Sequence, residues 1–359
     1  MRNFLSIDWD FFSYSPHEMD QDDPDTPHTV PGTDHNGKAI KAELNQLLDW
    51  GGTEAHGGML ATIIWLNRIA NAVSWGVEIR DVIGLVNRGG NIMPQPFTEH
   101  ILEIWPHLSY SKVYYGDSHA MALFGVNAMH TIEQRNSMRA ADTDDPEGVE
   151  VTPIRVVHFD AHHDMGYDAE QVYGQQRQGS SDCASWLWHM IDLERVAEVM
   201  FVMPNWTKGY PWTRVLEGID DRYQHIEQYL DKIVALTWDE WVATDRPEKN
   251  ETIDGAYVCR SGTWVPPWLD NEFLQFVKGL THKLQPYTEE YCAEHNIPCI
   301  GVDITERRDW NWNVVHQHAD ALRRMRSGKL IDTLMEDLDA NALDRIINKG
   351  ENLERSKRA

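Results

Sequence analysis

Short apolar runs that end in polar side chains recur along this chain, and helical patterns lie between them. Such runs are typical of strands buried on both faces of a parallel sheet. We expect strands at residues 4–7, 113–115, 154–159, 199–202, 233–237, 256–259 and 299–303. Apolar spacings of three and four residues predict helices at 39–48, 59–74, 118–134, 184–196, 271–284 and 314–347. This alternation favours a three-layer α/β/α fold around a mostly parallel central sheet.

The chain is 359 residues long, a length that one elaborated α/β domain can reach. We therefore expect a single catalytic domain over residues 1–359, with an inserted loop and helical region at about 14–100. Within that insert, residues 21–38 are acidic and contain three prolines, as expected for a surface loop.

The net charge of −25 would repel a phosphate backbone, so the composition excludes nucleic acid as a partner and favours cationic ones. The four cysteines show no paired CxxC spacing, which predicts reduced thiols. No continuous apolar segment is long enough for a membrane span, and the first residues, with two early aspartates, do not resemble a signal peptide. We expect a cytoplasmic protein without a membrane partner.

The strongest motif is the run VVHFDAHHD at residues 156–164, where an apolar strand leads directly into Asp160, His162 and Asp164. In open α/β sheets, ligands bind outside the carboxyl ends of the strands. Carboxylates with imidazoles suit Mn²⁺ or a similar divalent ion. The alternative is a polar cluster that merely caps the next helix, but a cap needs only one such residue. Closely spaced charges of this kind repel one another unless a cation compensates them.

Two further segments carry the same types of side chain. His119 follows a predicted strand and a glycine turn, in the run YYGDSHA. Taken alone, a histidine at the start of a helix is more often a surface or capping residue. Asp8 and Asp10 stand at i and i+2 in the run SIDWDFF, so both lie on one side of an extended chain. On an exposed strand such a pair would be ordinary solvated charge.

Together these segments resemble the ureohydrolase superfamily of arginases, agmatinases and formiminoglutamases. GDSHA, DAHHD and SIDWDFF are similar to three of that family's metal-binding segments, and the run CIGVDITE is similar to the strand whose final glutamate, here Glu306, holds the substrate guanidinium. The family normally places its Asp-x-Asp strand after the Asp-Ala-His-x-Asp strand, so this chain has a circularly permuted motif order. A competing segment at residues 236–240 follows DAHHD but lacks aspartates at i and i+2.

The resemblance implies two Mn²⁺ per chain in an arginase/deacetylase-like fold. It gives Asp8 and Asp160 as ligands shared by both ions. One ion is completed by His119 and Asp164, and the other by His162 and Asp10. It also implies that the two ions lower the pKa of a shared water.

The same resemblance implies catalytic roles for two acidic residues. Asp164 would relay a proton to the leaving nitrogen, and Glu306 would pair with the planar guanidinium. His163, the remaining histidine of DAHHD, is a further candidate at the catalytic site, with a supporting role behind the ligands as the simpler expectation.

Substrate choice is less constrained by the sequence. We find no loop of small polar residues that would bind the α-carboxylate and α-amine of free arginine. The 15 tryptophans could form an extended recognition surface, or could equally fill the core. Glu54 and His56 lie in a glycine-rich segment that is either a substrate loop or a helix connection.

The pattern is similar to that of peptide arginases, which convert arginine to ornithine within ribosomally made peptides. We therefore expect Mn²⁺-dependent hydrolysis of peptidyl-arginine to peptidyl-ornithine and urea, on an arginine-containing precursor peptide. The alternatives are a small-molecule ureohydrolase, a deacetylase-like amidohydrolase with one zinc, or a noncatalytic peptide-binding module. The sequence is compatible with a homo-oligomer.

Overall fold

This computed structural model describes residues 1–13, 58–74, 76–80, 83, 92–143, 145, 149–207, 224–244, 251–262, 264–297 and 310–326. The chain divides into two compact units. One comprises the described parts of residues 1–65 and 83–310, and the other those of 66–82 and 311–359.

The first unit is built on a seven-stranded sheet in which every neighbouring pair of strands is parallel. The strand order is β5-β4-β3-β1-β6-β2-β7. The strands are β1 (Arg2–Asp8), β2 (Lys112–Gly116), β3 (Ile154–Phe159), β4 (Val196–Met203), β5 (Ile233–Thr237), β6 (Ile253–Cys259) and β7 (Lys283–Pro286). β1 lies in the middle of the sheet, between β3 and β6, so its last residues are surrounded by other strand ends.

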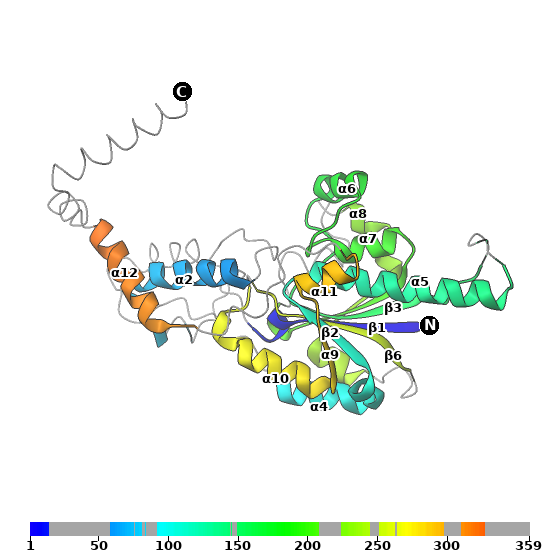
Figure 1. Cartoon of the computed structure of the whole chain (residues 1–359), viewed down its shortest axis with the longest axis horizontal. Helices are drawn as coiled ribbons and strands as arrows, with labels where there is room; N and C mark the ends of the chain where they lie inside the picture. Colours follow the sequence, from blue (N-terminus) through cyan, green and yellow to red (C-terminus); the bar gives the residue numbers. More distant parts are fainter. Residues whose placement is uncertain are drawn as a thin grey trace, which may run out of the picture. The chain divides into compact units, whose positions relative to one another are not determined.

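Helices cover both faces of this sheet (Figure 1). One face carries α5 (Ala122–Ala140), α6 (Ala169–Gln178), α7 (Trp186–Asp192), α8 (Gln224–Glu227) and α11 (Glu289–Glu294). The other carries α4 (Pro94–Ile104), α9 (Trp238–Ala243) and α10 (Asp270–Leu280). Short 3₁₀ helices include η1 (Trp9–Phe12), η3 (Pro106–Tyr110), η4 (His119–Met121), η5 (Asn205–Thr207), η8 (Leu230–Lys232) and η9 (Pro267–Leu269). The architecture is therefore the expected three-layer α/β/α fold.

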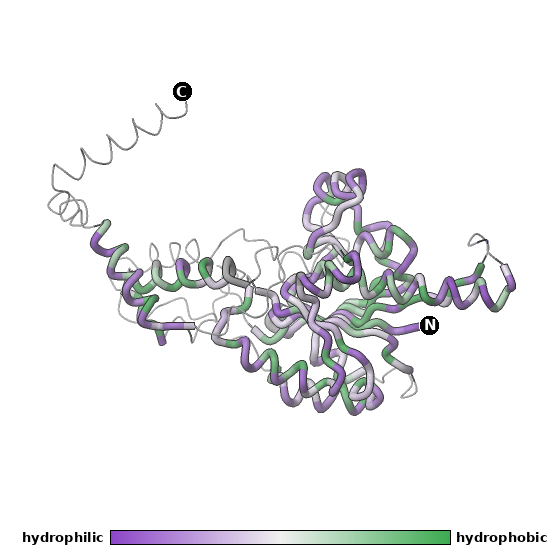
Figure 2. Tube along the Cα trace, viewed as in Figure 1, coloured by the Kyte–Doolittle hydropathy of each residue, from purple (hydrophilic) through white to green (hydrophobic). Residues whose placement is uncertain are grey.

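Strand alternation divides the core between the two faces. In β1, Phe4 packs with the α5 and α7 layer, whereas Leu5 and Ile7 pack with the α4 and α10 layer. Val156 and Val157 of β3 divide in the same way. Figure 2 shows α4 and α10 with alternating hydrophobic and hydrophilic residues, as expected of helices that bury one side against a sheet.

Six of the seven expected strands are confirmed, with bounds that differ by a few residues. The seventh, at 299–303, lies outside the described residues. β7 takes the last place in the sheet, although the sequence predicted that a helix would run through residue 284. That helix, α10, ends at Leu280, and a short edge strand containing Pro286 follows it. An edge position tolerates a proline because one side of the strand makes no ladder.

The second unit includes α12 (Trp312–Arg326) and the later turns of α2 (Gly58–Ser74). His318 Nε2 lies 2.8 Å from Asn67 Oδ1, and the Arg323 guanidinium donates to the backbone oxygen of Val73. These contacts join the two helices of this unit. In the part of the chain that the structure describes, no helix combines the length and the apolar character needed to cross a bilayer.

Candidate metal centre

Acidic and imidazole side chains gather at the carboxyl edge of the sheet, around the ends of β1 and β3. The two strands are parallel neighbours, and Ser6 of β1 is in register with His158 of β3. Alternation then directs Asp8 and Asp160, each two residues further on, toward the face covered by α5 and α7. His119 comes to the same place from the 3₁₀ turn before α5. The parallel sheet thus brings together three segments that are far apart in sequence.

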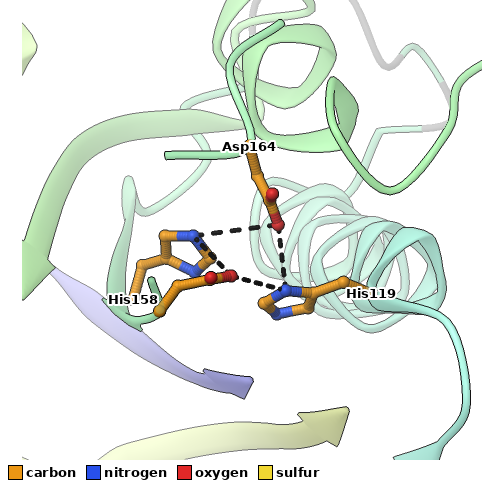
Figure 3. Close-up of side chains that lie close together, drawn as sticks. His119, His158 and Asp164 are labelled. Carbon is orange, nitrogen blue, oxygen red and sulfur yellow. Dashed lines mark ion pairs between the residues drawn. The ribbon is translucent and has the colours of Figure 1, made fainter. Parts of the chain in front are cut away.

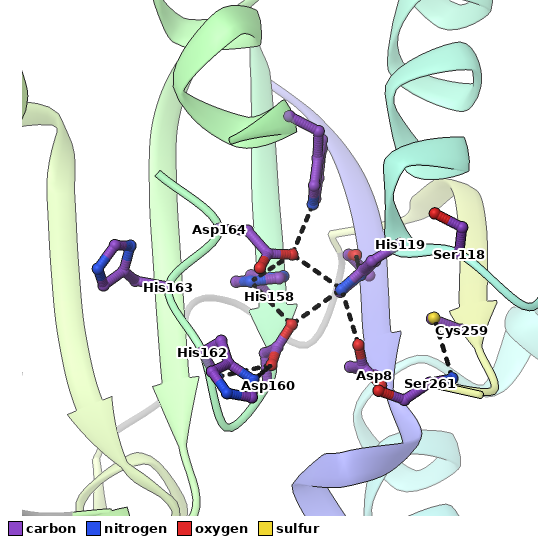
Figure 4. A network of polar contacts seen from close by, with 12 residues as sticks. Asp8, Ser118, His119, His158, Asp160, His162, His163, Asp164, Cys259 and Ser261 are labelled. Carbon is purple, nitrogen blue, oxygen red and sulfur yellow. Dashed lines mark hydrogen bonds and ion pairs between the residues drawn. The ribbon is translucent and has the colours of Figure 1, made fainter. Parts of the chain in front are cut away.

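His119 lies at the centre of this group (Figures 3 and 4). Its Nδ1 is 3.2 Å from Asp8 Oδ2, 2.8 Å from Asp160 Oδ2 and 2.9 Å from Asp164 Oδ2. All four side chains are almost completely buried. A single imidazole nitrogen therefore faces three carboxylates in a place that water hardly reaches.

The other nitrogen of His119 has a partner in β1. Its Nε2 lies 2.6 Å from Ser6 Oγ. When Nε2–H donates to this hydroxyl, Nδ1 keeps its lone pair toward the carboxylates, as a metal ligand requires. The loop before the helix is anchored by Tyr257, whose hydroxyl donates to the backbone oxygen of Ser118 at 2.6 Å. β1 and β6 thus set both the position and the orientation of the ring.

A second group lies beside the first and shares Asp160 with it. His162 Nδ1 is 2.9 Å from Asp10 Oδ2 and 3.6 Å from Asp160 Oδ1. Asp10 is held by the backbone N–H of Ala161, which donates to its Oδ1 at 3.3 Å. The His162 side chain is 16 % exposed, and the Trp264 ring lies 5.6 Å from it. This group is therefore the more accessible of the two.

Asp164 is held at the end of DAHHD by an uncommon backbone conformation. Its φ of 52° lies in the left-handed region, which costs a non-glycine residue energy. Trp186 Nε1 donates to its Oδ2 at 2.7 Å. Two residues later, Gly166 has a φ of 82°, and a Cβ there would come 2.2 Å from Val172. The loop is thus shaped around the carboxylate of Asp164.

The sequence did not predict His158 as a member of this site. Its Nε2 lies 3.3 Å from Asp160 Oδ2 and 3.8 Å from Asp164 Oδ2, and its ring is fully buried (Figure 3). In the sequence it stands between a valine and a phenylalanine, within an apolar run that indicates only a strand. Alternation could have found it, because Val156, His158 and Asp160 must point to the same face.

The carboxylates of this cluster resist ionisation in the absence of a cation. Burial raises the pKa of Asp160 well above its usual range, and the charges of Asp164 and Asp10 raise it further. Burial followed by the charge of Asp10 raises the pKa of Asp8. Burial also raises the pKa of Asp164. Closely packed carboxylates of this kind become stable as anions when a positive charge joins them.

The buried imidazoles divide into two kinds. Burial opposes the charged form of His119, yet Asp164 and the hydrogen bonds with Asp160 outweigh burial and raise its pKa well above the usual value. His158 shows the opposite result, because burial and the nearby His119 put its pKa well below the usual value. A neutral imidazole keeps a free lone pair and can act as a ligand.

Two overlapping sets of donors can hold metal ions within the described residues. One comprises His119, His158, Asp160 and Asp164, and the other comprises Asp10, Asp160 and His162. In each set the donor atoms lie within 4.8 Å of one another. Imidazole nitrogens with carboxylate oxygens suit Mn²⁺, Fe²⁺, Zn²⁺ and similar ions, so the donor chemistry fits a divalent metal without fixing which one.

Of the remaining predicted site residues, the structure describes only His163. His163 follows His162, but its Nδ1 accepts a hydrogen bond from the backbone N–H of Met165 at 3.0 Å. Its ring packs on Tyr167 at 4.5 Å, away from the carboxylates (Figure 4). Glu306, Glu54 and His56 lie outside the described residues.

A second buried charge cluster lies next to this site. Arg260 follows β6 and is 1 % exposed, and its guanidinium pairs with Asp117 and, at 3.4 Å, with Asp270. Its backbone N–H donates to the oxygen of Gly116 at 2.7 Å. Since Asp117 stands two residues before His119, this ion pair ties the end of β6 to the loop that carries the histidine.

No protein-family model, curated protein or solved structure matches this chain. Its class therefore rests on its own geometry. It is a parallel three-layer α/β protein with a buried His/Asp cluster of the kind that binds metal ions.

Proposed function

We propose that this chain is a binuclear metal hydrolase that acts on guanidinium groups, with two Mn²⁺ as cofactors and arginine side chains of peptides as substrates. The observation that carries the proposal is the meeting of SIDWDFF, GDSHA and DAHHD at one edge of the sheet. These are the segments that resemble ureohydrolase metal ligands. Because all three segments meet at the same edge of the sheet, they can contribute to one metal site.

The position of β1 supports the permuted ligand set. Asp8 and Asp10 lie beside the end of β3 even though they precede it in the chain by about 150 residues, as the contact between Asp10 and Ala161 shows. The competing segment at 236–240 spans the end of β5 and the start of α9, and β4 and β3 lie between β5 and β1 in the sheet. The N-terminal pair is therefore better placed to serve as ligands.

The residues suggest a division of roles. Two divalent cations held here would supply Lewis acidity and lower the pKa of a water molecule. Asp164, oriented by Trp186, is placed to accept a proton and deliver it to the leaving nitrogen. Glu306 is proposed to pair with the guanidinium, because a carboxylate matches that planar cation in bidentate geometry.

Charge and exposure favour a cationic substrate. The net charge of −25 attracts cations, and the most exposed ligand candidate is His162, which has Trp264 beside it. An aromatic ring at an entrance can contact both a planar cation and the peptide that bears it. These features support an arginine-containing precursor peptide over free arginine.

Incubation of the Mn²⁺-loaded protein with an arginine-containing precursor peptide tests the proposal. We expect each converted residue to lose one CH₂N₂ unit by mass spectrometry, with one urea released for each ornithine. Activity on free arginine or agmatine alone would replace the peptide substrate with a small molecule. Activity on acetyl-lysine peptides with a single bound ion would indicate the deacetylase alternative, and bound peptide without turnover would indicate a binding module.

A further inference from the structure

His158 is a buried imidazole to which the resemblance assigns no role. His158 is 0 % exposed, and among the described residues neither of its ring nitrogens has a hydrogen bond of good geometry, although the backbone of His162 is close enough to favour its charged form. Buried polar groups in folded proteins nearly always have a partner, because leaving one unpaired costs free energy. Nε2, which faces two carboxylates, therefore requires a partner other than the backbone.

The packing around His158 directs its nitrogen edge toward the carboxylates. The rings of Trp186 and Phe201 lie 5.8 Å and 5.5 Å from it. These rings fix the position of the imidazole but accept no conventional hydrogen bond from it. Nε2 faces Asp160 and Asp164 instead (Figure 3).

The distances suit donors that share one ion. Donor atoms bound at about 2.1 Å from a metal lie about 3.0 Å apart at neighbouring corners of an octahedron and about 3.4 Å apart in a tetrahedron. His158 Nε2 lies 3.3 Å and 3.8 Å from its two carboxylate oxygens, and His119 Nδ1 lies 2.8 Å and 2.9 Å from the same atoms. The four donors surround one point closely enough for a single cation.

We infer that His158 is a metal ligand, and that it makes the two metal sites unequal. The deep site then has two imidazoles and two carboxylates, all buried, whereas the outer site has His162, Asp10 and the shared Asp160. More donors and less water favour tighter binding at the deep site. The two sites therefore fill in order, the deep one first, and the outer ion exchanges more readily. This inference rests on the proposed binuclear function and adds the order of loading.

Metal binding tests this inference without any substrate. The full chain is stripped with a chelator and titrated with Mn²⁺ by calorimetry, and the bound metal is counted by elemental analysis after desalting. We expect two classes of site in the wild-type chain. His158→Gln and His158→Phe should lower the Mn²⁺ affinity of the tighter class of site by at least about tenfold, because a side chain that holds the metal is lost. The phenylalanine variant keeps an aromatic ring between Trp186 and Phe201.

Two comparisons make the result specific. His162→Gln should weaken the looser class and leave the tighter one. His189→Gln, which removes a nearly buried imidazole on α7 that contacts Gln175, should change neither. Circular dichroism of the metal-free variants checks that each remains folded.

The outcomes separate this inference from the proposed function. If both His158 variants bind two Mn²⁺ with wild-type affinities, His158 is not a ligand, although the binuclear hydrolase stands. If the wild-type chain binds two ions of equal affinity, the order of loading is wrong. If it binds no divalent ion at all, the proposed function and this inference both fail.

Discussion

Two buried clusters of charged side chains lie at the carboxyl edge of the sheet, and their negative charge is neutralised in different ways. In the first, Arg260 provides a permanent cation between Asp117 and Asp270. In the second, carboxylates surround imidazoles, and within the described part of the chain none of these carboxylates contacts a lysine or arginine. The four carboxylates are those of Asp8, Asp10, Asp160 and Asp164.

The first cluster is neutralised by the chain's own guanidinium, whereas the second is one that a metal ion could neutralise. A buried ion pair with its own guanidinium is complete as folded, and removing one member leaves an uncompensated charge. Buried carboxylates without a permanent cation must hold protons or a metal ion, and the raised pKa of Asp160 reflects this need. The two clusters should therefore respond in opposite ways to loss of charge and to added metal.

The largest expected effect is on activity. Asp160 belongs to both donor sets, so Asp160→Asn should remove the ligand that they share. We expect kcat/KM on the peptide to fall by about 10⁴-fold, or about 5 kcal/mol at 1.36 kcal/mol per factor of ten. Peptide turnover and Mn²⁺ content are measured together. Unchanged activity with full metal content would contradict the shared-ligand assignment.

The stability of the metal-free chain sharpens the same comparison. Asp160→Asn removes a buried carboxylate that has no permanent cation, so the free energy of unfolding without metal should stay the same or rise. Asp117→Asn is the matched control, because it makes the same replacement of a carboxylate by an amide, but at a carboxylate that is paired with Arg260. It should lower that free energy by about 1–3 kcal/mol, as measured by urea unfolding in the presence of a chelator.

The next effect concerns the guanidinium itself. Arg260→Met leaves Asp117 and Asp270 buried without the cation that joins them, and we expect a loss of about 3–5 kcal/mol in the free energy of unfolding. Urea denaturation measures it. Saturating Mn²⁺ should not remove this difference in the free energy of unfolding between variant and wild type, since the metal binds at the other cluster. A variant as stable as the wild-type chain would break the comparison.

The smallest expected effect comes from the hydroxyl behind His119. Ser6→Ala removes the partner of Nε2, so the ring no longer has its tautomer and orientation fixed. We expect Mn²⁺ affinity to fall by about tenfold with little change in fold stability. Ser111→Ala is a suitable control, because Ser111 Oγ donates to His107 O outside the cluster. Equal affinities in Ser6→Ala and wild type would mean that packing alone orients His119.

The strands were largely predictable because their residues are buried on both faces and so form continuous apolar runs. α4 and β7 were not predicted, and neither were the helices α6, α8, α9 and α11. α4 begins in the stretch that the sequence predicts as an insert, at about 14–100, yet its Phe97 and Ile101 are fully buried in the core. β7 follows α10 after a short gap, and its residues Leu284 and Gln285 fit a helical pattern as well as a strand. Only pairing with β2 decides between these readings.

The site was predictable where a motif carries it and unpredictable where the fold alone does. Asp160, His162 and Asp164 stand within one short segment, so their association needs no tertiary information. Ser6 and His158 look like ordinary strand residues, and their role appears only when β1 and β3 pair in register. The pairing of Arg260 with Asp117 likewise depends on which strands become neighbours.

The central place of β1 has a consequence for folding. This strand supplies Ser6, Asp8 and Asp10, but its partners lie far along the chain, as shown by the separation of 251 residues between Asn3 and Asp254. Contacts of such high sequence separation slow folding, because much chain must be ordered before they form. The metal centre therefore forms late in folding. The rate of Mn²⁺ binding during refolding would then report how fast the native sheet is completed.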